Sequence, residues 1–74
     1  MLGLLINDKE QVELEFVVKR ELEELLFDLE DHRIDQLVKQ SMRERYKVLF
    51  QLLRRVASEE EIKKYIPKQV KNEY

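Results

Sequence analysis

Residues 8–29 read DKEQVELEFVVKRELEELLFDL, and their apolar positions decide the fold class. Five aliphatic residues recur there at spacings of four, four, three and four, namely Leu14, Val18, Leu22, Leu25 and Leu29. At about 100° per residue, such side chains form one narrow stripe along an α-helix. The sequence therefore predicts an amphipathic helix over residues 8–29 with one face in a core.

The ends of this helix are also indicated by the sequence. Asn7 followed by Glu10 has the form of a capping box, in which each side chain accepts from the other residue's backbone N–H. Residues 28–33 contain Asp28, Glu30 and Asp31 and are the predicted turn, because aspartate is a weak helix former and a common cap. No glycine or proline lies in this turn, so one long continuous helix is the alternative.

A second helix is predicted over residues 34–57. Its apolar residues share one broad face: Ile34, Val38, Met42, Tyr46, Leu49, Phe50, Leu52, Leu53 and Val56. Ser41 and Glu44 repeat the S-x-x-E pattern, so a break at Ser41 is an alternative. We favour a continuous helix, because the apolar stripe keeps its phase across that position.

Ser58 and Glu61 form a third capping-box pattern, and Pro67 ends the short helix that follows it. Residues 68–74 are expected to fray. The predicted fold is all-α, an antiparallel helical hairpin with a short third C-terminal helix, and residues 1–74 form one domain.

The composition limits how such a fold is stabilised. The 74 residues include no cysteine, which excludes disulfides and thiolate metal sites. A chain this short buries only about 60% of its unfolded surface, so it depends on good helix packing or oligomerisation. Residues 1–6 are apolar but too short for a signal peptide, and no run approaches the roughly 20 apolar residues of a membrane span. We expect a cytoplasmic protein.

Residues for catalysis are few. The chain has one histidine, His32, and one glycine, so a glycine-rich phosphate loop is excluded. Asp28, Asp31 and Asp35 lie near His32, but Leu29 stands where a di-iron Glu-x-x-His pattern requires glutamate. We expect a solvated turn there, with no metal, no cofactor, no small-molecule substrate and no enzyme activity.

Charge is divided unevenly along the chain. Residues 1–35 contain eleven acids and four bases, whereas residues 36–74 contain ten bases and five acids. Two complementary helices in a hairpin explain this division without a ligand. The second helix also has a basic strip that is predicted to lie opposite its apolar face, formed by Lys39, Arg43, Lys47 and Arg54.

The basic strip gives the alternative function, a nucleic-acid-binding regulator, because such a row can contact phosphates. No aromatic residue interleaves with it, the net charge is −2, and no recognition motif is present. We therefore expect a solvated face without nucleic acid. Binding to a membrane surface would use the apolar face that the core needs.

Arg45 falls at the centre of the predicted apolar face of the second helix. A buried arginine needs a partner, because an unpaired buried charge costs several kcal/mol. We predict an ion pair between Arg45 and Glu21 of the first helix.

Phe16 and Phe27 lie eleven residues apart, so they point nearly the same way, roughly opposite the first helix's leucine stripe. Arg20 and Glu23 lie between them and are close enough to pair. The segment 1–6 or the third helix, through Ile62, Tyr65 and Ile66, is one possible cover for these phenylalanines. We favour a partner chain, because exposed apolar patches usually mark interfaces.

The commonest such solution is a two-fold homodimer with a four-helix arrangement. The expected function is therefore that of a small non-catalytic interaction protein. It either forms a homodimer or binds another protein as an adaptor or regulator.

In size and composition the chain resembles short all-helical cytosolic proteins of Gram-positive bacteria. Ile34-Asp35, followed by Glu44, Tyr46 and Leu49, resembles part of the IDEAL domain of such bacteria. The chain departs from that pattern at Leu37-Val38-Lys39, where the domain has Ala-Leu-Asp, and at Met42, where it has a second aspartate. The resemblance covers about a quarter of the chain and implies no catalytic residues.

Overall fold

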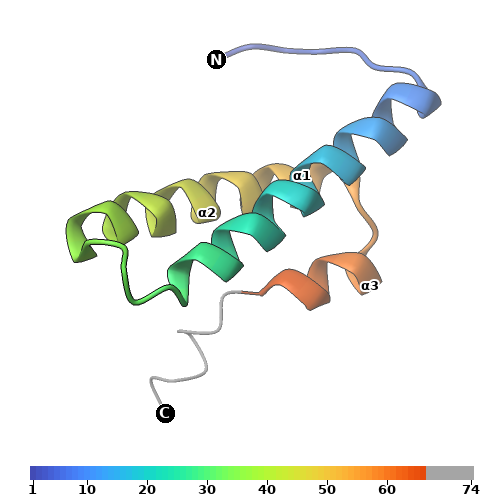
Figure 1. The fold of residues 1–74 in the computed structure, drawn as a ribbon. Coiled ribbons are helices and arrows are strands. Elements are labelled where there is room, and N and C mark those ends of the chain that lie inside the picture. The colour runs from blue at the N-terminus through green and yellow to red at the C-terminus, as the bar shows by residue number, and fades with distance from the viewer. Residues whose placement is uncertain (67–74) are drawn as a thin grey trace.

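The computed structural model describes residues 1–66 as two long antiparallel helices with a short helix beside them (Figure 1). Helix α1 spans Asp8–Leu29 and helix α2 spans Gln36–Val56. Helix α3 spans Glu59–Ile62 and continues into a 3-10 turn, η1, over Lys63–Tyr65. The predicted all-α hairpin with a short third helix is confirmed, and the alternative of one continuous helix is wrong. The tail over residues 68–74, predicted to fray, lies outside the described residues.

Helix α1 begins and ends where the sequence predicts. The Asn7 side chain accepts from the Glu10 backbone N–H at 2.8 Å, and Glu10 accepts from the Asn7 N–H at 2.9 Å. This reciprocal capping box satisfies two donors that no helical carbonyl can reach. Residues 1–6 precede it without helical structure and are exposed, apart from the three helices (Figure 1).

The turn lies two residues later than predicted, over residues 30–35. Asp31 accepts from the Arg33 backbone N–H at 2.9 Å and from its guanidinium at 3.0 and 3.1 Å. These hydrogen bonds, those to the side chain foremost, hold the pKa of the Asp31 carboxyl below its usual value. Asp35 then caps α2 by accepting from the Leu37 N–H at 3.2 Å. Because Asp35 caps α2, Ile34 remains in the turn.

Helix α2 is continuous through Ser41, as favoured, but its core side is rotated from the predicted one. Tyr46 and Leu53 lie at its centre and are buried, whereas the Arg45 side chain is 60% exposed. The broad apolar arc of α2 covers more of the helix than α1 can bury. The expectation that Arg45 is buried is therefore wrong.

The core lies where α1, α2 and η1 meet. Leu22 of α1 and Leu53 of α2 are fully buried. The other buried apolar residues around them are Val18, Leu25, Tyr46 and Tyr65. Leu14 and Leu26 extend this core along α1, and Leu49 and Phe50 extend it along α2.

Hydrogen bonds and ion pairs fasten α3 and η1 to the hairpin. The Lys19 ammonium bridges Glu15 at 2.6 Å and Glu61 at 2.5 Å. Hydrogen bonds to Glu15 and then to Glu61 hold the pKa of Lys19 well above its usual range. The Tyr46 hydroxyl donates to the Tyr65 carbonyl at 2.6 Å. These contacts join residues that are far apart in sequence, so they hold the short helix in one position against the hairpin.

The third capping box is only half formed. The Ser58 hydroxyl accepts from the Glu61 N–H at 3.4 Å. The Glu61 carboxylate pairs instead with Lys19 and, at 3.0 Å, with Lys64. Lys19 and then Lys64 hold the pKa of Glu61 below its usual value. The glutamate thus fastens α3 to α1 rather than capping its own helix.

The two tyrosines that hold η1 on the hairpin, Tyr46 and Tyr65, predict a dependence of stability on pH. Burial raises the pKa of Tyr46 and of Tyr65 to about 12, and the hydrogen bond to Glu23 adds to the rise at Tyr65. An unfolded tyrosine ionises near pH 10. Between about pH 10 and 12 the folded chain therefore holds more protons than the unfolded chain, and stability falls as pH rises. Thermal unfolding followed by circular dichroism should give a lower Tm at pH 11 than at pH 9.

A chain with Tyr65 replaced by phenylalanine is the control for this titration. It removes one of the two hydroxyls whose pKa burial raises, so the drop in Tm between the two pH values should shrink. An equal drop in both proteins would contradict the assignment.

None of the helices within residues 1–66 is long and apolar enough to cross a membrane.

Candidate interaction surface

The side of α1 that points away from the core is partly apolar. We call Val12, Phe16, Arg20, Glu23 and Phe27 the outer face of α1. The side chains of Val12, Phe16 and Phe27 are 65%, 58% and 78% exposed, respectively. They lie roughly opposite the buried stripe of the same helix. Two phenylalanines in water on one helix are unusual for a chain that gains so much from burial.

Neither of the two possible covers within the monomer buries these phenylalanines in the part of the chain that the structure describes. Residues 1–6 are themselves exposed. Ile62 and Tyr65 pack into the core cluster on the flank of α1, and the Tyr65 hydroxyl donates to Glu23 at 2.7 Å. The short third helix therefore stops at the edge of the outer face.

Arg20 and Glu23, which the sequence places close enough to pair, do not pair with each other. Arg20 approaches Glu24, one turn on, at 3.9 Å. Glu23 instead accepts the Tyr65 hydroxyl. Because 3.9 Å is long for an ion pair and both side chains are well exposed, the Arg20 guanidinium remains accessible to a partner.

Arg45 and Glu21 do lie together, with the guanidinium 3.2 Å from the carboxylate. The pair connects α2 to α1 at the surface rather than in the core. Exposed pairs of this kind contribute about 0–1 kcal/mol. The contact therefore adds little to the stability of the hairpin.

The basic strip is not one exposed row, and the prediction for Lys39 is wrong. The Lys39 side chain is only 7% exposed, and residues 1–66 contain no buried polar side-chain atom without a hydrogen-bond partner. Lys39 lies on the same side of α2 as Tyr46 and Leu53, so its aliphatic stem is covered. Arg43 is half-buried, and Lys47 and Arg54 are exposed.

A second exposed apolar patch lies on α2 and was not among the predictions. Leu37 and Val48 are 73% and 68% exposed, and Val38 is 51% exposed. Leu37 and Val48 are eleven residues apart, the same spacing as Phe16 and Phe27, so the sequence contained this signal. We call Leu37 and Val48 the α2 patch.

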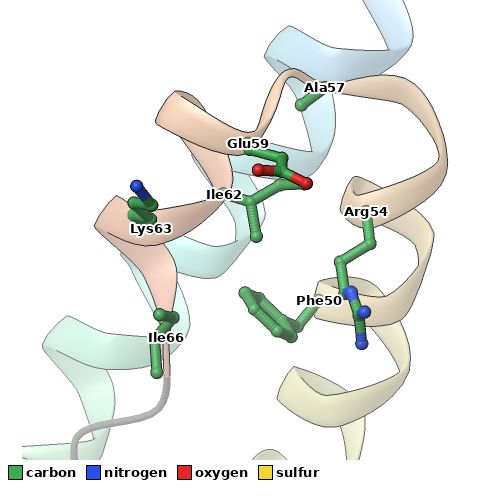
Figure 2. Close-up of a pocket in the computed structure, with 7 residues that line it drawn as sticks. All are labelled: Phe50, Arg54, Ala57, Glu59, Ile62, Lys63 and Ile66. Atoms are coloured by element: carbon green, nitrogen blue, oxygen red, sulfur yellow. The ribbon is translucent and has the colours of Figure 1, made fainter.

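An open groove separates α2 from α3 and is partly apolar. Its volume is about 470 Å³. Figure 2 shows the Phe50 ring of α2 and the Ile62 side chain of α3 pointing toward one another across it. The remaining lining residues are Arg54, Ala57, Glu59, Lys63 and Ile66.

The turn around His32 offers no metal site in the described structure. Within residues 1–66 no three histidine or acidic side chains are placed to hold an ion. Asp31 is occupied by Arg33, and Asp35 caps α2.

Comparisons with known proteins give no relative for this chain. No family model, no curated protein and no solved structure matches it.

Proposed function

We propose that this chain is a non-catalytic interaction protein that pairs with a second copy of itself through the outer face of α1. The observation that supports this most is the exposure of Phe16 and Phe27 on one face, opposite the core. Large apolar side chains on one exposed face usually mark an interface.

The order of residues on this face is self-complementary. Consider two antiparallel α1 helices related by a two-fold axis that passes between positions 21 and 22. Phe16 then lies opposite Phe27 of the second copy, and Arg20 lies opposite Glu23. Each contact occurs twice, as a two-fold interface requires. The face therefore offers aromatic pairs at its ends and opposite charges at its centre.

The expected affinity is moderate. Full burial of a phenylalanine contributes about 1.5–3 kcal/mol, and a dimer of this kind covers four of them. Association itself costs about 4–15 kcal/mol in lost freedom of motion. The two sums are comparable, so we expect a dimer that dissociates on dilution.

The α2 patch supports a similar pairing less well. In an antiparallel α2 pair that places Leu37 opposite Val48, Ser41 lies opposite Glu44, and no opposite charges meet. Its side chains are also aliphatic, whereas aromatic residues are enriched in interface cores. The outer face of α1 is therefore the better surface for a second copy.

Cysteine crosslinking tests this geometry, because the natural chain contains no cysteine. Position 20 lies about two residues from the proposed axis, so Arg20→Cys should crosslink to itself rapidly with a short bismaleimide. Val48→Cys on the α2 patch is the matched control and should crosslink slowly. Slow crosslinking at position 20, or faster crosslinking at position 48, would contradict the proposal.

A further inference from the structure

The groove between α2 and α3 combines an apolar floor with a mainly basic rim. Phe50 and Ile62 are half-buried in the floor, and Ile66 is 42% exposed at its end. Arg54 stands on the α2 side of the opening and Lys63 on the α3 side (Figure 2). Its volume of about 470 Å³ lies within the range of ligand-binding pockets, about 300–1,000 Å³.

The bases at this opening are available to a ligand. Among the ion pairs within residues 1–66, none involves Arg54 or Lys63. Arg54 has only a long 3.5 Å contact to Gln51. Lys47 lies on the same side of α2 and pairs loosely with Glu44, at 3.8 Å. One acid, Glu59, also lines the groove.

We propose that this groove binds an acidic amphipathic helix of a partner protein. Apolar side chains one turn apart on that helix would pack on Phe50, Ile62 and Ile66, in the helix-in-groove mode of recognition. Its carboxylates would lie along α2 and meet Lys47 and Arg54, which are about 10 Å apart along the helix axis at 1.5 Å per residue. Two turns of the bound helix span that distance.

The sequences at the two ends of the chain do not have this chemistry. Residues 1–6 contain no acid, and residues 67–74 contain two lysines and one glutamate. The α1 helix of another copy is acidic, but a heterologous contact between it and the groove would build rings or filaments rather than the two-fold dimer proposed above.

A nucleic acid fits the groove less well than an acidic helix. The groove lining offers one aromatic ring, Phe50, for base stacking, whereas its aliphatic side chains suit the apolar residues of a partner helix. Lys39, which would have lengthened a phosphate-binding row, is buried.

Two synthetic peptides of about 14 residues, four helical turns, test the inference. Both carry leucines at the same amphipathic spacing, and their polar positions are all glutamate in one and all lysine in the other. Fluorescence anisotropy should show that the glutamate peptide binds, and that its affinity falls with added salt. NMR methyl shifts on binding should concentrate at Ile62 and Ile66.

Three variants separate charge from packing. Arg54→Glu with Lys63→Glu should lower the affinity for the glutamate peptide at least about tenfold. Glu59→Gln should raise the affinity for the glutamate peptide, since the Glu59 carboxylate repels the glutamates of the peptide. Phe16→Glu with Phe27→Glu changes the outer face of α1 and should leave peptide binding unchanged, which keeps this test independent of the dimer. Circular dichroism should show all three folded, because these side chains are exposed.

Several outcomes would overturn the inference. They are no binding of the glutamate peptide, equal or tighter binding of the lysine peptide, and shifts that fall on the outer face of α1. A mixed-sequence single-stranded DNA that competes for the groove more tightly than the glutamate peptide would assign the groove to nucleic acid instead. If the natural chain forms species larger than a dimer, and these disappear in the Arg54→Glu/Lys63→Glu protein, the groove would be assigned to another copy of this chain instead.

Discussion

Replacing Leu53 by alanine should lower the free energy of unfolding by about 2–5 kcal/mol, the usual loss for a buried leucine. Leu53 is fully buried, as is Leu22, within the core shared by the two long helices. A domain of this length has roughly 4–11 kcal/mol of stability in total, at about 0.05–0.15 kcal/mol per residue. The variant should therefore be partly or wholly unfolded in mild urea, as measured by circular dichroism.

The α2 patch provides the control for this substitution. Val48 lies on the same helix but is 68% exposed, so Val48→Ala should change stability by no more than about 0.5 kcal/mol. Leu22→Ala should resemble Leu53→Ala. Equal losses for Leu53→Ala and Val48→Ala would mean that the core is not where the structure places it.

Replacing Tyr46 by phenylalanine should cost about 1–3 kcal/mol, although it removes one oxygen atom. The Tyr46 hydroxyl donates to the Tyr65 carbonyl at 2.6 Å in a buried contact. Without it, a buried backbone acceptor loses its partner, which carries that penalty. Because the contact connects α2 to η1, amide hydrogen exchange in residues 59–65 should also accelerate.

Tyr65→Phe is the matched control. It also removes one hydroxyl, but the partner that it leaves behind, the Glu23 carboxylate, can turn to water. Its cost should be smaller than that of Tyr46→Phe. A larger cost for Tyr65→Phe would show that the contact with Glu23, rather than the one with the carbonyl, holds η1 in place.

Helix α1 could be predicted to the residue, because two independent signals agree. The stripe from Leu14 to Leu29 gives the buried face, and Asn7 with Glu10 gives the first turn. The turn was harder to place, because Asp31 and Asp35 are both suitable caps. The choice between them depends on how Arg33 folds back on Asp31, which spacing alone does not show.

The rotation of α2 could not be predicted, and this accounts for the errors at Arg45 and Lys39. Apolar residues cover more than half of the circumference of α2, so periodicity does not define one centre. The hydrogen bond between Tyr46 of α2 and Tyr65 of η1 defines which side of α2 faces the core. That contact joins segments nineteen residues apart, and it turns Lys39 inward and Arg45 outward.

The outer face of α1 could be predicted as a surface because Phe16 and Phe27 fall outside the leucine stripe. The pairing of the charged residues on this face could not be predicted. Glu23 accepts a hydrogen bond from the Tyr65 hydroxyl of η1, and Arg20 approaches Glu24 instead. The proposed dimer depends on this outer face and would leave the groove between α2 and α3 open to another partner.

Sedimentation equilibrium of the natural chain, over a wide range of concentrations, tests the proposed dimer most directly. We expect a monomer–dimer equilibrium that reaches twice the 9.1 kDa chain mass. The Phe16→Glu/Phe27→Glu protein should remain monomeric and folded, whereas a Val48→Glu control should dimerise like the natural chain. A natural chain that stays monomeric at every concentration, or a dimer that survives in the double variant, would contradict the pairing through α1.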